Sequence, residues 1–138
     1  MAWGTVASEP EAPLALRLEQ LYRELTAVIR AHAPDEAAIE ETLVNRNPAT
    51  SLRLGQARGV VLLAAVHAGL AVAEYGAKTV KRAVTGTGGA SKEQVGAMVR
   101  VLLPGIGSPG PDAADALAIA ICHAHHRATR TRIREAMR

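Results

Sequence analysis

The stretch GPDAADALAIAICHAHH, residues 110–126, combines an alanine-rich run with two aspartates near its start. Pro111 followed by Asp112 predicts the start of a helix, with the Asp112 carboxylate capping free backbone N–H groups. Asp115 comes three residues later, where a carboxylate favours the positive end of a helix. Residues three apart share one helical face, so the two carboxylates could also bind one cation. These residues leave both interpretations open, a capped helix or half of a metal site.

Histidines follow at the end of the same stretch, and His123 and His126 fall on one helical face. Zinc is one interpretation of this pair, but no further ligand motif supports it. The alternative is that the helix ends here, where its C-terminus favours imidazolium.

Composition restricts the class of protein. The 138 residues fit one domain, and 49% hydrophobic residues provide for a sizeable core. With no Phe, one Trp and two Tyr, that core must come from closely packed small side chains. The single cysteine, Cys122, excludes an internal disulfide and a cysteine-rich zinc site, and a cytoplasmic location is therefore expected. No apolar run is long enough to span a membrane, so no membrane partner is expected.

Hydrophobic periodicity predicts alternating helices and strands, and therefore the α/β class. Gly55 and Gly59, four residues apart in one predicted helix, indicate that something packs closely against it, either a second copy of the chain or the chain's own sheet. The expected strands cover residues 2–8, 36–41 and 70–75, and the expected helices cover 13–32, 50–70 with a Thr50 or Ser51 cap, 77–84, 91–103 with a Ser91 and Gln94 capping box, and 112–126.

Carboxylates also stand at the end of the second expected strand. Functional groups in open α/β sheets gather beyond the carboxyl ends of strands, so Glu40 or Glu41 is expected there. Adjacent strand residues point to opposite faces, so only one of the two can join Asp112 and Asp115. Such a thiol-free, oxygen-rich set suits magnesium or manganese.

Positive charge is concentrated at the end of the chain. Residues 128–138 form a basic C-terminal tail, preceded by Arg127, although the net charge of the whole chain is only +3. A basic tail suits a phosphate backbone, and the alternative is a solvated or frayed helix end.

Three longer stretches give a family resemblance: AAIEETLVNRNPATSLRLGQARG, AEYGAKTVKRAVTGTGGASKEQVGAMV and DAADALAIAICHAH. In this order and spacing they resemble the RuvC-type Holliday-junction resolvases. The resemblance implies a ribonuclease-H-like mixed sheet flanked by helices, in a nuclease domain over residues 1–127. It also implies a homodimer that makes paired symmetric nicks in four-way junction DNA during recombination and repair. The branch-migration proteins RuvA and RuvB are the further partners it implies.

Site residues follow from the same resemblance. Glu40, Asp112 and Asp115 match three of the four acidic ligands for Mg²⁺ or Mn²⁺, with two ions per site. Lys81 and Lys92 match lysines near the cleaved backbone, where a cation stabilises charge developing on the phosphate. The implied DNA-binding residues are Leu43, Arg46, Arg53, Arg58, Lys81 and Lys92.

Two departures from the family pattern give further expectations. The chain is expected to start after the family's first two strands, so the aspartate of the first strand, the fourth ligand, is expected to be missing. Leu43 stands where relatives place an aromatic residue, which favours an apolar wedge over base stacking. The alternative function is a cleavage-deficient fragment that binds junctions. A helical partner protein without DNA affinity would explain the amphipathic helix but not the lysines and carboxylates.

Overall fold

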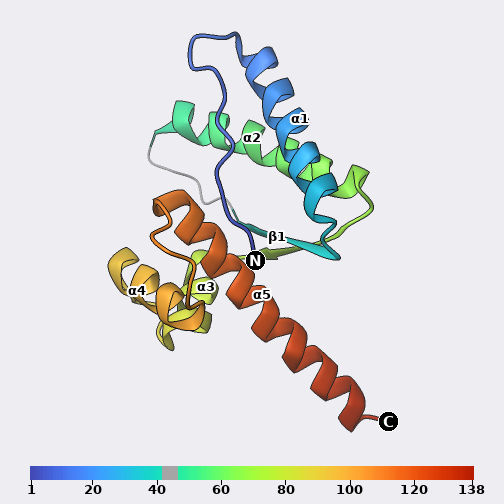
Figure 1. The fold of residues 1–138 in the computed structure, drawn as a ribbon, viewed down its shortest axis with the longest axis vertical. Helices are drawn as coiled ribbons and strands as arrows, with labels where there is room; N and C mark the ends of the chain where they lie inside the picture. The colour runs from blue at the N-terminus through green and yellow to red at the C-terminus, as the bar shows by residue number, and fades with distance from the viewer. Residues whose placement is uncertain (42–46) are drawn as a thin grey trace. The chain divides into compact units, whose positions relative to one another are not determined.

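A computed structural model describes residues 1–41 and 47–138. The described residues form an α/β fold in which two strands alternate with helices, as predicted (Figure 1). Its elements, in chain order, are α1 (Leu14–His32), β1 (Glu36–Glu40), α2 (Pro48–His67), β2 (Ala71–Tyr75), α3 (Ala77–Thr85), α4 (Lys92–Leu102) and α5 (Pro111–Ala136).

The chain divides into two compact units. The first unit comprises residues 1–5, 38–40 and 74–138, and the second comprises residues 6–37 and 41–73. The predicted boundary between a nuclease domain and a tail, after residue 127, falls inside α5.

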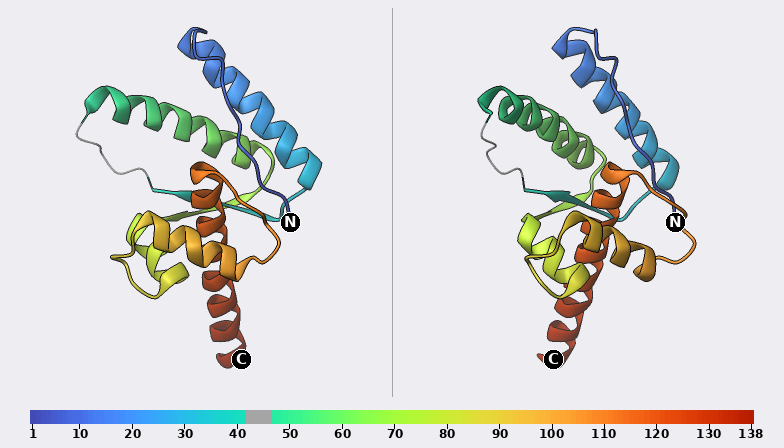
Figure 2. Two further views of the ribbon diagram at one scale, coloured as in Figure 1. Left: turned by 60° about the vertical axis from the view of Figure 1, so that its left-hand side comes forward. Right: turned by 90° about the vertical axis from the view of Figure 1, so that its left-hand side faces the viewer.

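The two strands are hydrogen-bonded neighbours, and they run in the same direction (Figure 2). Helix α2 connects them, since parallel strands need a crossover between one strand and the next. Both strands end in the first unit, β1 at Glu40 and β2 at Tyr75. The carboxyl ends of the strands, where functional groups were expected, therefore belong to the unit that contains α3, α4 and α5.

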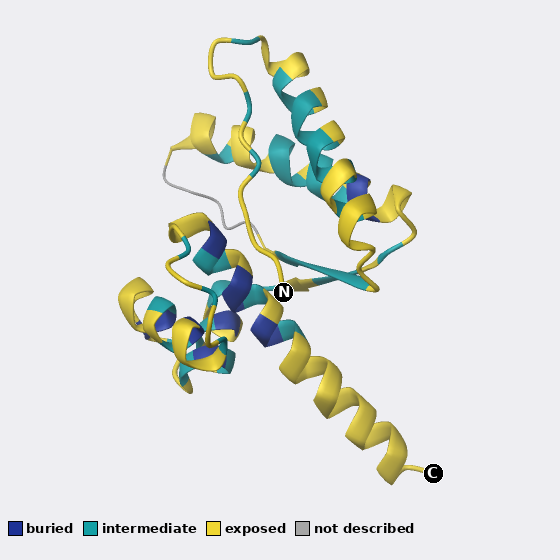
Figure 3. Ribbon diagram, viewed as in Figure 1, coloured by how far each residue is buried: buried dark blue, intermediate teal, exposed yellow. Residues whose placement is uncertain are grey.

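The core of the first unit lies where α3 and α4 pack against the N-terminal part of α5 (Figure 3). Val99 of α4 and Cys122 of α5 have no exposed surface. Burial raises the pKa of the Cys122 thiol, because the thiolate would lose its hydration there. The other buried members of this core are small or medium-sized: Val80, Val84, Ala90, Val95, Leu117, Ala118 and Ile121.

In the second unit, α1 packs against α2. Tyr22 of α1 and His67 of α2 share a hydrogen bond of 2.8 Å between the phenol oxygen and Nδ1. Ala64 and Ala65 are the buried residues of α2. Helix α1 has no fully buried residue, so its contacts are those of a half-buried amphipathic helix, as its periodicity predicted.

Several predicted boundaries are confirmed closely. Helix α1 and strands β1 and β2 each begin and end within two residues of the expected bounds. The capping box of α4 is present: the Ser91 hydroxyl accepts from the Gln94 N–H at 3.2 Å, and the Gln94 side chain accepts from the Ser91 N–H at 2.8 Å.

Two expectations from the sequence are wrong: a strand at residues 2–8, and a start of α2 at Thr50 or Ser51. Residues 2–8 form no strand, and the Trp3 indole Nε1–H instead donates to the Ile106 carbonyl oxygen at 3.0 Å. Helix α2 begins at Pro48 with Asn47 as its cap, rather than at Thr50 or Ser51. The Asn47 side chain accepts from the N–H groups of residues 49 and 50, and proline suits the first helical position because it needs no N–H partner there.

Both ends of α5 also differ from the expectation. Gly110 occupies the N-cap position and makes no side-chain hydrogen bond, so Asp112 lies in the first turn and is not the cap. Pro111 at the first helical position fixes this register. The helix does not end at His126 but continues to Ala136, since no Gly or Pro interrupts residues 127–136.

Among the described residues, no helix has the length and apolar character needed to cross a membrane.

Two valines of α4 test the proposed core. Val99 is completely buried, whereas Val101 on the same helix is 69% exposed. Val99→Ala should lower the free energy of unfolding by about 2 kcal/mol, because it removes buried methyl groups and leaves a cavity. Val101→Ala should change it by less than about 0.5 kcal/mol. Urea denaturation of both variants measures this difference, and equal losses would contradict the assigned core.

Candidate functional site

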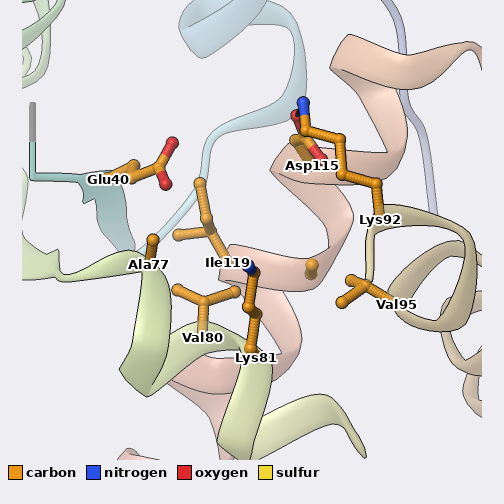
Figure 4. A pocket seen from close by; sticks show the side chains of 9 residues that line it. Glu40, Ala77, Val80, Lys81, Lys92, Val95, Asp115 and Ile119 are labelled. Carbon is orange, nitrogen blue, oxygen red and sulfur yellow. Dashed lines mark ion pairs between the residues drawn. The ribbon is translucent and has the colours of Figure 1, made fainter. Parts of the chain in front are cut away.

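A pocket of about 190 Å³ opens in the first unit, at the carboxyl end of β1 and against α3, α4 and α5 (Figure 4). Its polar lining consists of two carboxylates and two ammonium groups, and its other lining residues are small or aliphatic. The lining residues are Glu40, Ala77, Val80, Lys81, Lys92, Val95, Asp115, Ala118 and Ile119.

Glu40 reaches the pocket because it is the last residue of β1. Its carboxylate is directed toward the interior of the pocket, across from the helices that carry the other polar groups (Figure 4). Glu41 does not line the pocket. This agrees with the expectation that only one of the two adjacent glutamates serves the site, since neighbouring strand residues point to opposite faces.

Asp115 of α5 and Lys92 of α4 both line the pocket, and they form an ion pair with each other. The Lys92 Nζ lies 3.5 Å from the Asp115 Oδ2, and their side chains are 78% and 48% exposed. Lys92 is the first residue of α4, and the Ser91 and Gln94 capping box fixes the start of this helix. Because ion pairs this exposed contribute less than about 1 kcal/mol, the pair can be broken by a competing cation or anion.

Lys81 approaches the pocket from α3 and is half-buried. It follows Val80, which belongs to the buried core and also lines the pocket. Val95 and Ala118 likewise belong to the buried core and line the pocket. The floor of the pocket is therefore the outer surface of the core, an apolar wall that strengthens electrostatic interactions beside it.

The structure thus brings together four of the residues singled out from the sequence: Glu40, Lys81, Lys92 and Asp115. Asp112 is exposed, one turn before Asp115, and does not line the pocket. Among the described residues, no group of three or more His, Cys, Asp or Glu side chains is placed to hold a metal ion.

The other predicted DNA-binding residues lie elsewhere in the chain. Arg53 and Arg58 are on α2, in the second unit. Leu43 and Arg46 lie outside the described residues.

A tyrosine that the sequence analysis did not single out accounts for the paired histidines. The Tyr75 phenol oxygen lies 2.8 Å from Nδ1 of His123, and the tyrosine ring stacks on His126 with centroids 5.1 Å apart. These contacts give both histidines a structural role within the first unit. The available signal was the position of Tyr75 at the end of a strand, but its partners are 48 and 51 residues away.

Comparisons with known proteins agree on one family. The family model for the crossover junction endodeoxyribonuclease RuvC matches residues 1–123. The RuvC of Rhodospirillum rubrum is 61% identical over 128 residues, which are 93% of this chain and 76% of that protein. The RuvC of Acidiphilium cryptum is 59% identical over 133 residues, which are 96% of this chain and 80% of that protein.

The fold is also similar to solved structures. Thermus thermophilus RuvC, in complex with a Holliday junction substrate, superposes with a TM-score of 0.87 and 36% sequence identity, over 95% of this chain and 80% of that one. A further structure of Thermus thermophilus RuvC gives a TM-score of 0.84 at the same identity and coverage.

An α/β chain with carboxylates and lysines converging at a strand end is suited to phosphodiester chemistry. The chain belongs to the RuvC family of crossover junction endodeoxyribonucleases, which are nucleases acting on DNA. The comparisons give no support to the alternative function, a cleavage-deficient fragment that binds junctions.

Proposed function

We propose that this chain resolves four-way DNA junctions by metal-dependent hydrolysis, with paired symmetric nicks made by a homodimer. The observation that carries the proposal is the convergence of Glu40, Asp115, Lys81 and Lys92 on one pocket, in a chain of this family. This combination of anionic and cationic side chains suits a phosphodiester held together with a divalent cation.

The donor set fits magnesium. Glu40 and Asp115 offer only oxygen ligands, and the described residues that line the pocket include no Cys or His. Mg²⁺ is commonly held by one or two carboxylates together with waters and substrate phosphates, so two protein ligands suffice for one ion. Mn²⁺ accepts the same oxygen ligands. Asp112 stays a predicted third ligand, because it shares a helical face with Asp115 and its side chain is exposed. Two ions per site likewise stay a prediction.

The side chains of the pocket have separate roles in this proposal. When bound, a divalent cation supplies an activated water and neutralises charge on the phosphate. Lys81, held by α3 against the apolar floor, binds a non-bridging oxygen of the scissile phosphate. Lys92 is the counter-ion of Asp115, and it would be available to the phosphate if Asp115 held a divalent cation.

The substrate and the partners rest on the family. The Thermus thermophilus relative was solved with a Holliday junction, and we infer the same DNA substrate for this chain. Leu43, Arg46, Arg53 and Arg58 are proposed to extend its DNA-binding surface. RuvA and RuvB are its proposed partners in branch migration, and the cytoplasm is its proposed location.

Helix α2 supports the homodimer. One face of this helix is exposed and apolar, with residues at helical spacing. A Cβ atom at Gly55 or Gly59 would meet nothing within 4 Å among the described residues, so the chain's own sheet does not pack closely there. A two-fold partner could approach through this face, which consists of Leu52, Gly55, Gly59, Leu63 and Val66.

The carboxylates give the first test of the mechanism. Glu40→Gln and Asp115→Asn should abolish Mg²⁺ binding and junction cutting but retain junction binding, since they remove ligands without adding bulk. Asp112→Asn should also abolish cutting if Asp112 is the third ligand. Calorimetric Mg²⁺ titration, cutting assays and gel shifts in EDTA measure these effects. Glu41→Gln is the matched control and should behave as wild type, whereas cutting in EDTA would sink the mechanism.

Lys92 gives a test that does not depend on activity. Lys92→Met should tighten Mg²⁺ binding by up to about fivefold, because it removes the ammonium that competes for Asp115. The same variant should cut more slowly in a single turnover. Lys78→Met, an exposed lysine of α3 outside the pocket, serves as the control. Unchanged or weaker Mg²⁺ binding by Lys92→Met would show that Lys92 is not the counter-ion.

The dimer contact is tested by adding bulk at Gly59. Gly59→Leu should leave the fold of each protomer intact, because the site is open and leucine favours a helix. It should shift the protein toward monomer in sedimentation velocity, since the two backbones could no longer approach. Gly59→Ala should have a smaller effect. A Gly59→Leu protein that is folded and fully dimeric rules out this contact.

A further inference from the structure

The C-terminal part of α5 extends beyond the packed helices of the first unit (Figure 3). Every residue from 124 to 138 is exposed. Within residues 127–138 there are five arginines and one glutamate. Residues 127–138, which are helical as far as Ala136, therefore form an extension with a strong positive charge. They are not the frayed tail that was one alternative from the sequence.

Four of the five arginines form a line along this extension. Arg127, Arg130 and Arg134 are three and four residues apart, a spacing that places them on one helical face. Arg138 continues the spacing just beyond the end of the helix. We call these four residues the arginine stripe. The fifth arginine, Arg132, lies on the opposite side, roughly 140–160° around the axis from the three stripe residues within the helix at 100° per residue.

This stripe is unfavourable for the helix by itself. Like charges three or four residues apart destabilise a helix, and an exposed helical segment gains little from packing. Glu135 lies about 100° around the axis from Arg134, and it is three residues from Arg138, the one stripe residue with which it can pair. Its single negative charge does not offset four arginines. A polyanion bound along this face would change repulsion into attraction and stabilise the extension.

We propose that the arginine stripe binds the phosphate backbone of a duplex arm of the DNA junction. The proposal rests on the proposed function for the identity of the nucleic acid. Arginines four residues apart are separated by about 6 Å along a helix, and each strand of a duplex presents one phosphate for about every 3.4 Å of its axis, so phosphates are dense enough for each stripe residue to meet one. The contact is independent of base sequence, so it adds affinity for any duplex arm.

The composition of the extension favours nucleic acid over a lipid surface. A helix that lies on a membrane needs a broad face of large apolar residues opposite its basic face. Here the large apolar residues are only Ile133 and Met137, and the remaining uncharged positions are alanines and threonines. The extension therefore has the charge required for an anionic membrane but lacks the apolar face.

The test uses the full chain and compares two faces of the same helix. Single variants Arg130→Ala and Arg134→Ala, and their double variant, are compared with Arg132→Ala as the matched control. Alanine favours the helix, so circular dichroism should show that all variants are folded. Affinity for a labelled duplex and a labelled four-way junction is measured at salt concentrations from about 50 to about 200 mM. EDTA is present throughout, so that the junction is not cut.

Each stripe substitution should lower the slope of log affinity against log salt by about 0.9, and the double variant by nearly twice that. Arg132→Ala should leave the slope unchanged. Equal slopes for Arg132→Ala and the stripe variants, or no change in any of them, would overturn the proposal. Stripe-dependent binding to phosphatidylserine vesicles without a change in the DNA slope would also overturn it. A wild-type protein that never cuts junctions yet shows these slope differences would refute the proposed function and retain the stripe.

Discussion

The close packing of α3 and α4 against the N-terminal part of α5 is the constraint on which the pocket depends. Small buried side chains such as Ala118 and Cys122 let these helices approach, and Val99 fills the space between them. Helices α3 and α5 also contribute a polar group near a buried residue: Lys81 follows Val80, and Asp115 lies three residues before Ala118. The core therefore positions the charges, and a cavity in it would displace them.

Much of the fold could be predicted because periodicity and turn residues are local signals. The helix ends were less predictable where two capping residues competed. Helix α2 already starts at Pro48 with Asn47 as its cap, so Thr50 and Ser51 lie inside the helix. Helix α5 starts at Pro111 after Gly110, so Asp112 lies inside its first turn. A side chain that could cap a helix does so only if its residue directly precedes the first residue of the helix.

The site was predicted partly from residues and partly from resemblance. The strand-end rule placed Glu40 or Glu41 at the site, and the alternation of side chains allowed only one of them there. The choice of Glu40 and the roles of Lys81 and Lys92 came from matched motifs. The ion pair of Lys92 with Asp115 and the contacts of Tyr75 with the histidines could not be predicted. They join residues 23 to 51 positions apart, so they depend on how the helices pack rather than on local sequence.

Helix α5 joins two regions of different charge. Its packed part brings Asp115 to a pocket where two carboxylates are balanced by two ammonium groups, so the pocket alone offers a phosphate little net attraction before a cation is bound. The exposed extension has a net positive charge and needs no cation to attract DNA. In the proposed function, affinity for duplex arms and chemistry at the scissile phosphate therefore come from different parts of one helix. Salt would weaken the attraction of the extension for DNA, since exposed charges are strongly screened, whereas the metal ion would act on the pocket.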